Sequence, residues 1–233
     1  RLPRVNSSGT DLIFLENQSG GPHFKESRLI HLNLANNNVS VIIDTNVSRP
    51  ILNGNTYGDP VTFYIPDSLP QNCFTSSNKH VILHCYTELK QCLVAVSLEE
   101  KTIRVLNFPV DSASILDFNG EVLVAVGSTI NLKPNVYIGK FNEKDLSYIN
   151  WIKVEDSELI SEVTFQYFSI PSDDQTKLIT AILVSPKQLE DQPSPAIITP
   201  HGGPNAGYAL SFMVYPIMFA NLGFKTLLGN ELD

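Results

Sequence analysis

Short runs of apolar residues alternate with turn-forming residues through the first two thirds of the chain. The runs are four to six residues long and are bounded by Gly, Asn, Ser, Asp and Pro, which is typical of β-strands. They are Leu12–Leu15, Leu29–Leu32, Val39–Ile43, Val81–His84, Leu93–Val96, Thr102–Leu106, Glu121–Val126 and Val136–Gly139. No amphipathic helix of useful length interrupts them. The pattern predicts an all-β region of many short strands.

This strand pattern repeats along the chain. Ser7–Asp11 leads into Leu12–Leu15, and Ser76–His80 leads into Val81–His84, about 69 residues further on. In each case a loop, a second strand, a short polar turn and a third strand follow. Recurring strand meanders of this kind favour the blades of a β-propeller, whose radial packing protects the strand edges. A β-sandwich with similar strand spacing stays open as the alternative.

The composition changes after Trp151. An acidic connecting segment with Glu155, Asp156, Glu158 and Glu162 follows, so we place a domain boundary between residues 154 and 155. Two longer alternating runs come next, Val163–Phe168 and Leu178–Val184. The turn-forming residues Pro171–Asp174 between them predict a β-hairpin.

A strand–helix–strand unit is expected near the end of the chain. Ala196–Thr199 is nearly all apolar, as expected of a strand buried on both faces, and Phe224–Leu228 predicts a second buried strand. Leu210–Leu222 predicts the helix between them, and Gly223 is a natural stop for it. Such a βαβ unit begins a parallel sheet of the α/β type.

Two further expectations concern this helix. Phe212, Tyr215, Phe219 and Leu222 lie near one face at helical spacing, which predicts the buried side. Pro216 lies inside the predicted helix and should kink or split it, because proline lacks the N–H that the helix interior needs.

The loop after the first of these strands carries the candidate chemistry. Its residues are His201, Gly202, Gly203 and Pro204. In acyl transfer, negative charge grows on the carbonyl oxygen, and backbone N–H groups fixed in advance stabilise it. Two glycines allow a sharp turn and let an amide approach the substrate without an intervening Cβ. His201 and Pro204 would support the loop. In α/β-hydrolases a Gly-rich loop after a buried strand supplies such a donor.

The rest of a hydrolytic site is missing from the sequence. A triad needs a nucleophile, a base and a carboxylate, yet the pentapeptide G-x-S-x-G does not occur, and His201 is the only histidine after the β region. Asp173, Asp174 and Asp191 are better interpreted as turn residues than as a catalytic acid. A plain Gly-Gly-Pro turn between a strand and a helix therefore stays open as the structural alternative.

Charge and cysteine content exclude several classes of partner. The net charge of −8 and the pI of about 5.1 disfavour nucleic acid and anionic membranes as partners. No leader-like segment or apolar run of membrane-spanning length occurs. Cys73, Cys85 and Cys92 have no CxxC spacing; we expect the first two to be core side chains and the protein to be cytoplasmic. No metal site or cofactor is implied.

Residues 163–230 resemble the start of the catalytic domain of the acylaminoacyl-peptidases, within the prolyl oligopeptidase group of serine peptidases. The matching segments are Ala196–Pro204, the Phe212–Phe219 helix with Pro216, Gly223-Phe224 and Leu227-Leu228. Upstream, Leu2–Phe14 and Cys73–Ser76 resemble the beginnings of propeller blades in the same group.

The resemblance implies a partial β-propeller in residues 1–154, followed by the start of an α/β-hydrolase (peptidase) domain in residues 155–233. It implies that the amide of Gly203, beside Gly202, meets the oxyanion. It also implies N-acylated short peptides as substrates, with a propeller that restricts access to small ones. Whether the parent protein is a homo-oligomer stays open.

The sequence departs from the family after Asn230. Glu231-Leu232-Asp233 stands where the family continues with an aromatic residue, Arg and Gly, and no triad residue follows. We therefore expect the chain as given to be inactive, to expose apolar surface near its last helix and strand, and to be poorly soluble. A non-catalytic propeller module that binds a partner is the alternative. Pro204 and the long β-rich region argue against a carboxylesterase or lipase.

Overall fold

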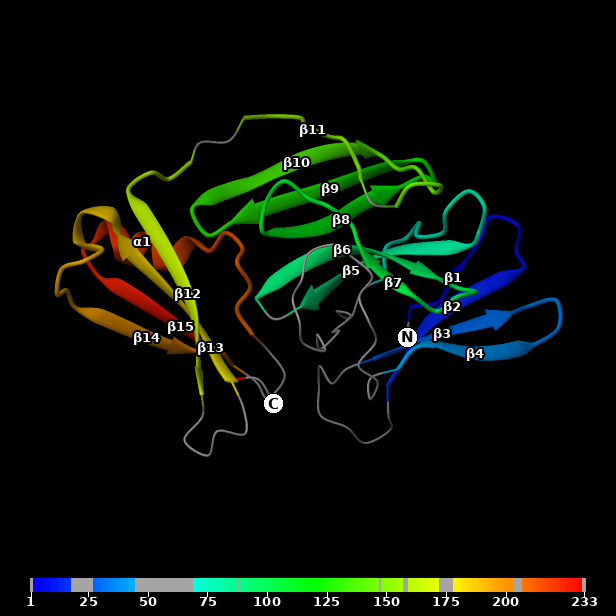
Figure 1. Ribbon diagram of the computed structural model, residues 1–233, viewed down its shortest axis with the longest axis horizontal. Coiled ribbons are helices and arrows are strands. Elements are labelled where there is room, and N and C mark those ends of the chain that lie inside the picture. Colours follow the sequence, from blue (N-terminus) through cyan, green and yellow to red (C-terminus); the bar gives the residue numbers. More distant parts are fainter. Residues whose placement is uncertain are drawn as a thin grey trace.

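Four β-sheets follow one another along the chain and fan out along an arc (Figure 1). The computed structural model describes residues 2–17, 27–44, 69–87, 89–146, 148–156, 159–171, 178–202 and 207–231. The first sheet contains β1 (Arg4–Val5), β2 (Asp11–Glu16), β3 (Arg28–Asn33) and β4 (Asn38–Ile43). The second contains β5 (His80–Thr87), β6 (Lys90–Ser97) and β7 (Ile103–Val105). The third contains β8 (Ser112–Phe118), β9 (Val122–Thr129), β10 (Leu132–Lys140) and β11 (Trp151–Lys153).

Every apolar run predicted to be a strand in this region is one, and the pairing is antiparallel in all three sheets. The sequence missed β1, β8 and β11. In β8 the cause is a register shift between Ile115 and Asp117, which places Leu116 and Asp117 side by side on the exposed side. Such a bulge breaks the alternation by which a strand is recognised.

The repeat of about 69 residues is confirmed in the pairing of strands. Val5 pairs with Leu12, and Phe74 pairs with Val81, each residue of the second pair lying 69 positions after its counterpart. The intervening turns match as well. Gly9 and Asn78, again 69 positions apart, adopt φ of 70° and 60° and donate backbone hydrogen bonds of 3.1 and 2.9 Å to the residue three positions before each. Glycine and asparagine are the residues that tolerate this left-handed conformation.

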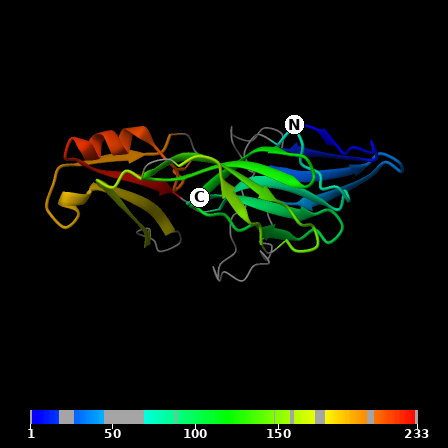
Figure 2. The same ribbon diagram turned by 90° about the horizontal axis from the view of Figure 1, so that it is seen from above.

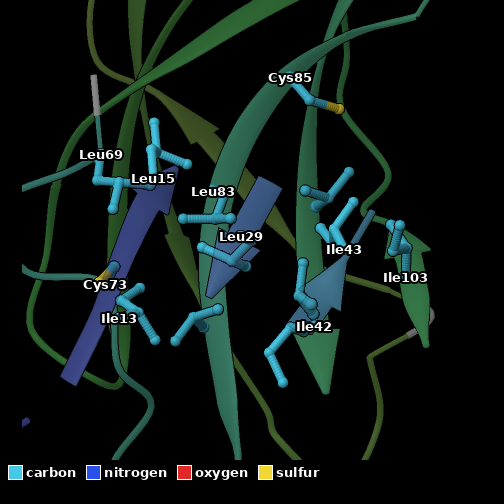
Figure 3. Packing of buried hydrophobic residues seen from close by; sticks show 13 residues of the cluster. Ile13, Leu15, Leu29, Ile42, Ile43, Leu69, Cys73, Leu83, Cys85 and Ile103 are labelled. Atoms are coloured by element: carbon cyan, nitrogen blue, oxygen red, sulfur yellow. The ribbon is translucent and has the colours of Figure 1, made fainter. Parts of the chain in front are cut away.

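Two hydrophobic cores hold the first three sheets together, and the middle sheet contributes to both. One core joins it to the first sheet, where Leu83 lies against Leu15 and Leu29 (Figure 3). The other joins it to the third sheet through Ile82 and Leu93. Successive residues of a strand point to opposite faces, so the near-continuous apolar runs of β5 and β6 serve a sheet that is covered on both sides. Cys73 and Cys85 are 1% and 0% exposed in the first core, as predicted.

A polar contact also ties the second sheet to the third. Glu143, which follows β10, accepts hydrogen bonds at Oε1 from Thr75 Oγ1 (2.6 Å) and Ser77 Oγ, and lies 3.0 Å from His80 Nδ1. Burial alone would raise the pKa of Glu143, but the hydrogen bonds from His80, Ser77 and Thr75 lower it below its usual range. The carboxylate is therefore charged at neutral pH, when it accepts all three contacts.

His84 on β5 makes stability depend on pH. Its side chain is 9% exposed, Nδ1 has no hydrogen-bond partner among the described residues, and burial lowers its pKa from 6.5 to about 4. The unfolded chain therefore takes up a proton near pH 6.5 while the folded chain does not. The resulting stability is complete above pH 6.5 and declines as the pH falls toward 4. We expect the loss from His84 to reach about 2 kcal/mol at pH 5.

Urea unfolding at pH 7.5 and at pH 5 measures this contribution. In a His84→Leu variant the difference between the two free energies of unfolding should shrink by about the same 2 kcal/mol, because the titrating group is gone. Equal pH dependence in the two proteins would show that His84 is not buried in its neutral form.

The fourth sheet has the order β12-β13-β15-β14 and is mixed. It contains β12 (Val163–Pro171), β13 (Leu178–Pro186), β14 (Ala196–Pro200) and β15 (Lys225–Glu231), with the short 3₁₀ helix η1 (Lys187–Leu189) after β13. β12 and β13 form the predicted antiparallel hairpin, although its turn lies outside the described residues. β14 and β15 pair in parallel across α1 (Val214–Asn221), as the predicted βαβ unit requires. Figure 2 shows α1 lying along one face of this sheet. The described residues as a whole are mostly β, with little helix.

The prediction that Ala196–Thr199 is buried on both faces was wrong. β14 is the last strand in the sheet order and alternates between exposed and half-buried residues, and Ile198 is 71% exposed. An apolar run shows that a strand is hydrophobic but does not show its position in the sheet, which depends on the strands that pair beside it.

The helix is shorter than predicted, and Pro216 lies in its first turn rather than in its interior. α1 begins after Met213, so Pro216 occupies the third helical position, where the missing N–H has no intrahelical acceptor in any case. No kink is therefore required. The buried side consists of Pro216, Ile217 and Ala220, and Leu222 is 66% exposed. Gly223 ends the helix as predicted, with φ at 87°.

The third core fills the space between α1 and its sheet. Ile182, Val184 and Leu228 from the strands meet Ile217 and Ala220 from the helix. Two turn residues of the neighbouring sheets, Leu89 and Ile130, belong to the same core. The fourth sheet is therefore packed against the second and third sheets by apolar contacts.

Exposed apolar side chains remain on α1 at Val214 and Met218, and just after it at Leu222. This confirms the expectation that the last helix exposes apolar surface. The same expectation is not met at Leu228 on β15, which is fully buried.

Candidate functional site

The candidate loop starts where β14 ends, at the carboxyl edge of the parallel β14–β15 pair. Pro200 is opposite Gly229 in the register, and the next residue, His201, donates its backbone N–H to the Gly229 carbonyl oxygen at 3.3 Å. Carboxyl edges of parallel strands are where α/β folds place their ligands. The first residue of the loop is therefore held against the last part of β15.

Of the four predicted site residues, two can be placed. His201 is half-buried, and Gly202 is exposed. A Cβ added at Gly202 would meet no atom of the described residues within 4 Å, so these residues leave open the side of the backbone that a side chain would occupy. The prediction for Gly203 and Pro204 lies outside the described residues.

Tyr208, where the chain returns from the loop, is held by the side chain of Asn230, to which the sequence assigned no role. Asn230 on β15 accepts a hydrogen bond at Oδ1 from Tyr208 N (2.6 Å) and donates from Nδ2 to Tyr208 O (2.7 Å). The Tyr208 hydroxyl donates in turn to Pro200 O at 3.3 Å. Tyr208 is thus bonded both to β15 and to the end of β14. The sequence signal for this contact is weak: Asn230 is an amide residue two positions after the apolar run Phe224–Leu228.

The segment after Tyr208 connects the loop to the other sheets. Leu210 N donates to Leu89 O, in the turn between β5 and β6, at 2.6 Å. Phe212 N donates to Ser128 Oγ on β9 at 3.1 Å. Both contacts join residues far apart in the sequence, so the position of the segment depends on the second and third sheets.

Tyr215 at the start of α1 lies in the same region. Burial raises the pKa of its hydroxyl, the neighbouring Tyr208 raises it further, and Thr199 lowers it somewhat. Tyr215 therefore stays protonated throughout the physiological range and can serve here as a neutral hydrogen-bonding group only.

Other chemistry is not evident in the part of the chain that the structure describes. Asp191 is an exposed turn residue, as predicted. Among the described residues, no three His, Cys, Asp or Glu side chains are arranged to hold a metal ion. The same residues include no helix whose length and hydrophobicity would let it cross a membrane.

Sequence comparison gives matches along nearly the whole chain. No protein-family model matches it. The acylamino-acid-releasing enzymes of Mus musculus and Homo sapiens are each 25% identical to it over 240 residues, which is 98% of this chain. The chain is a distant homologue of the acylamino-acid-releasing enzymes. The enzyme of Sus scrofa is 21% identical over 239 residues. The chain spans 32% of the length of each of these relatives.

Solved structures agree on the fold. A structure from a study of two prolyl endopeptidases matches with a TM-score of 0.65 at 13% identity, covering 98% of this chain and 31% of its own. Oligopeptidase B from Trypanosoma brucei matches with a TM-score of 0.64 at 14% identity, covering 94% of this chain and 30% of its own. Oligopeptidase B from Leishmania major matches with a TM-score of 0.64 at 13% identity, covering 97% of this chain and 31% of its own. The four sheets of this chain thus have the fold of a portion of these larger proteins.

Proposed function

We propose that this chain supplies the oxyanion side of the active site in a serine-type peptidase that releases N-acylated amino acids from the N-terminus of short peptides. The observation that carries the proposal is the Gly-rich loop at the carboxyl edge of β14 and β15, held at both ends by β15. A donor that must stabilise charge in the transition state has to be fixed before the reaction begins, and such a tethered loop is suited to that. Relationship to the acylamino-acid-releasing enzymes supports the choice of substrate.

The proposal includes the architecture. Residues 1–154 would form part of a β-propeller, with the sheets β1–β4, β5–β7 and β8–β11 as blades, and residues 155–233 would open an α/β-hydrolase domain. Support comes from the 69-residue repeat and from the packing of the middle sheet on both neighbours. The parallel β14–β15 pair with α1 supports the second part. The nucleophile, base and orienting acid would then come from other parts of a longer protein.

The complete gene product is the material for the test. We expect it to release N-acetylalanine from acetyl-alanyl peptides of a few residues and to react at a serine with a fluorophosphonate probe. The same peptide without its acetyl group serves as the control and should be a poor substrate. A gene product that neither hydrolyses the acetylated peptide nor takes up the probe would contradict the proposal and favour a non-catalytic module that binds a partner.

A further inference from the structure

The Asn230 side chain binds Tyr208 through both the backbone N–H and the backbone carbonyl of that residue. We propose that Asn230 is a positioning residue for catalysis, which fixes Tyr208, where the chain returns from the candidate loop, without touching substrate. The inference rests on the proposed peptidase function and adds a residue to it. Asn230 stands 22 positions after Tyr208, so the contact is a product of the fold rather than of the local sequence.

The geometry of the amide makes this contact rigid. The Asn230 side chain is 4% exposed, and its two bonds to Tyr208 N and O are 2.6 and 2.7 Å long. A primary amide that accepts from and donates to one residue reproduces the pairing of a neighbouring β-strand. Because the Asn230 amide is shielded from water, breaking the pair leaves its buried polar atoms unsatisfied. The amide also lies against Gly207, where an added Cβ would be 3.5 Å from Oδ1.

The hydrogen bonds described for His201 and Tyr208 converge on the ends of two strands. His201 N bonds to Gly229 O, Tyr208 bonds to Asn230, and the Tyr208 hydroxyl bonds to Pro200 O. The start and the return of the loop are therefore held by adjacent residues of β15, and the Tyr208 hydroxyl links the return to β14. Removing the Asn230 amide frees the return end while the start remains held. Displacing a preorganised donor by about 1 Å is enough to cost on the order of 100-fold in rate.

A matched control exists beside the third sheet, in the segments that precede β8 and β11. Asn107 binds Ile149 in the same way, donating from Nδ2 to Ile149 O at 2.9 Å and accepting from Ile149 N at 2.6 Å. Substitution of Asn107 by Ala removes an equivalent pair of bonds from the fold. Neither Asn107 nor Ile149 is a predicted site residue, so this variant reports the general loss of stability and nothing specific to the loop.

The experiment compares Asn230→Ala and Asn107→Ala in the complete gene product, with acetyl-alanyl peptide as substrate. For Asn230→Ala we expect kcat to fall about 10- to 100-fold with KM within about twofold, and amide hydrogen exchange of residues 201–208 to speed up. For Asn107→Ala we expect kcat and the exchange rate of residues 201–208 to stay at the wild-type level. The two variants should lose a similar amount of thermal stability. If Asn230→Ala does not fold, Asn230→Asp, which keeps the acceptor and loses the donor, takes its place.

The outcomes separate this inference from the function on which it rests. Equal kcat in wild type and the Asn230 variant, or an equal fall in the Asn107 variant, overturns the positioning role while the peptidase assignment stands. A wild-type protein without acyl-peptidase activity overturns the proposed function and the catalytic role together. In that case the exchange rates still show whether Asn230 holds the loop.

Discussion

Replacing Gly203 by valine in the complete gene product should lower kcat for acetyl-alanyl peptides by about 100- to 1,000-fold and change KM little. The loss is the size found when one oxyanion donor is removed. In the proposed site the donor is a backbone amide, which cannot be deleted, but a β-branched side chain beside it would prevent the close approach of the substrate carbonyl and restrict the backbone angles that glycine allows. Since the interaction forms fully only in the transition state, kcat rather than KM should respond.

Steady-state kinetics together with a thermal melt decide this prediction. Ala35→Val is the control, because Ala35 is an exposed turn residue between β3 and β4, in the first sheet. The control should keep its wild-type kcat, and both variants should melt close to the wild-type temperature. A Gly203→Val enzyme with unchanged kcat would show that the loop makes no catalytic contact at Gly203.

The second large effect concerns the core between the second and third sheets. Phe118→Ala should lower the free energy of unfolding by about 3–5 kcal/mol, as is usual when a fully buried phenylalanine is truncated. Phe118 is 1% exposed and contacts Phe141 edge to face, with ring centroids 5.6 Å apart. The substitution removes both the buried area and the aromatic contact. A loss of this size is a large share of the stability of an ordinary domain.

Leu116→Ala is the matched control on the same strand. Leu116 lies two residues before Phe118 but is 55% exposed, because the bulge in β8 turns it away from the core. Its truncation should change the free energy of unfolding by no more than about 0.5 kcal/mol. Denaturant titration of the two variants beside wild type measures both values. Similar losses at the two positions would mean that β8 has a different register from the one described.

The strands were largely predictable because the alternation of apolar and polar residues reflects which side chains of a strand are buried. Short apolar runs bounded by turn residues gave every strand of the second sheet, and the repeat in Ser7–Asp11 and Ser76–His80 gave the equivalence of the first two sheets. Local signals failed where the backbone departs from regularity. The bulge at Ile115–Asp117 concealed β8, and the position of Pro216 could not be judged without knowing that α1 starts at Val214.

For the candidate site, the sequence located the loop that follows β14. Glycines next to a histidine after an apolar strand predict a loop built for close approach, and its catalytic role stays a prediction. The contacts that hold this loop could not be found in the same way. Ser128 and Leu89 bind its return segment from other sheets, and nothing near them in the sequence marks them for that role.

By itself the sequence determined most of the strands and the 69-residue repeat, because these depend on neighbouring residues and on the side chains themselves. Only the tertiary structure decided that β14 is the last strand in its sheet order and that Asn230 binds Tyr208. Both depend on which strands pair and in what register, and that choice is made by the burial of whole faces and the satisfaction of distant hydrogen bonds.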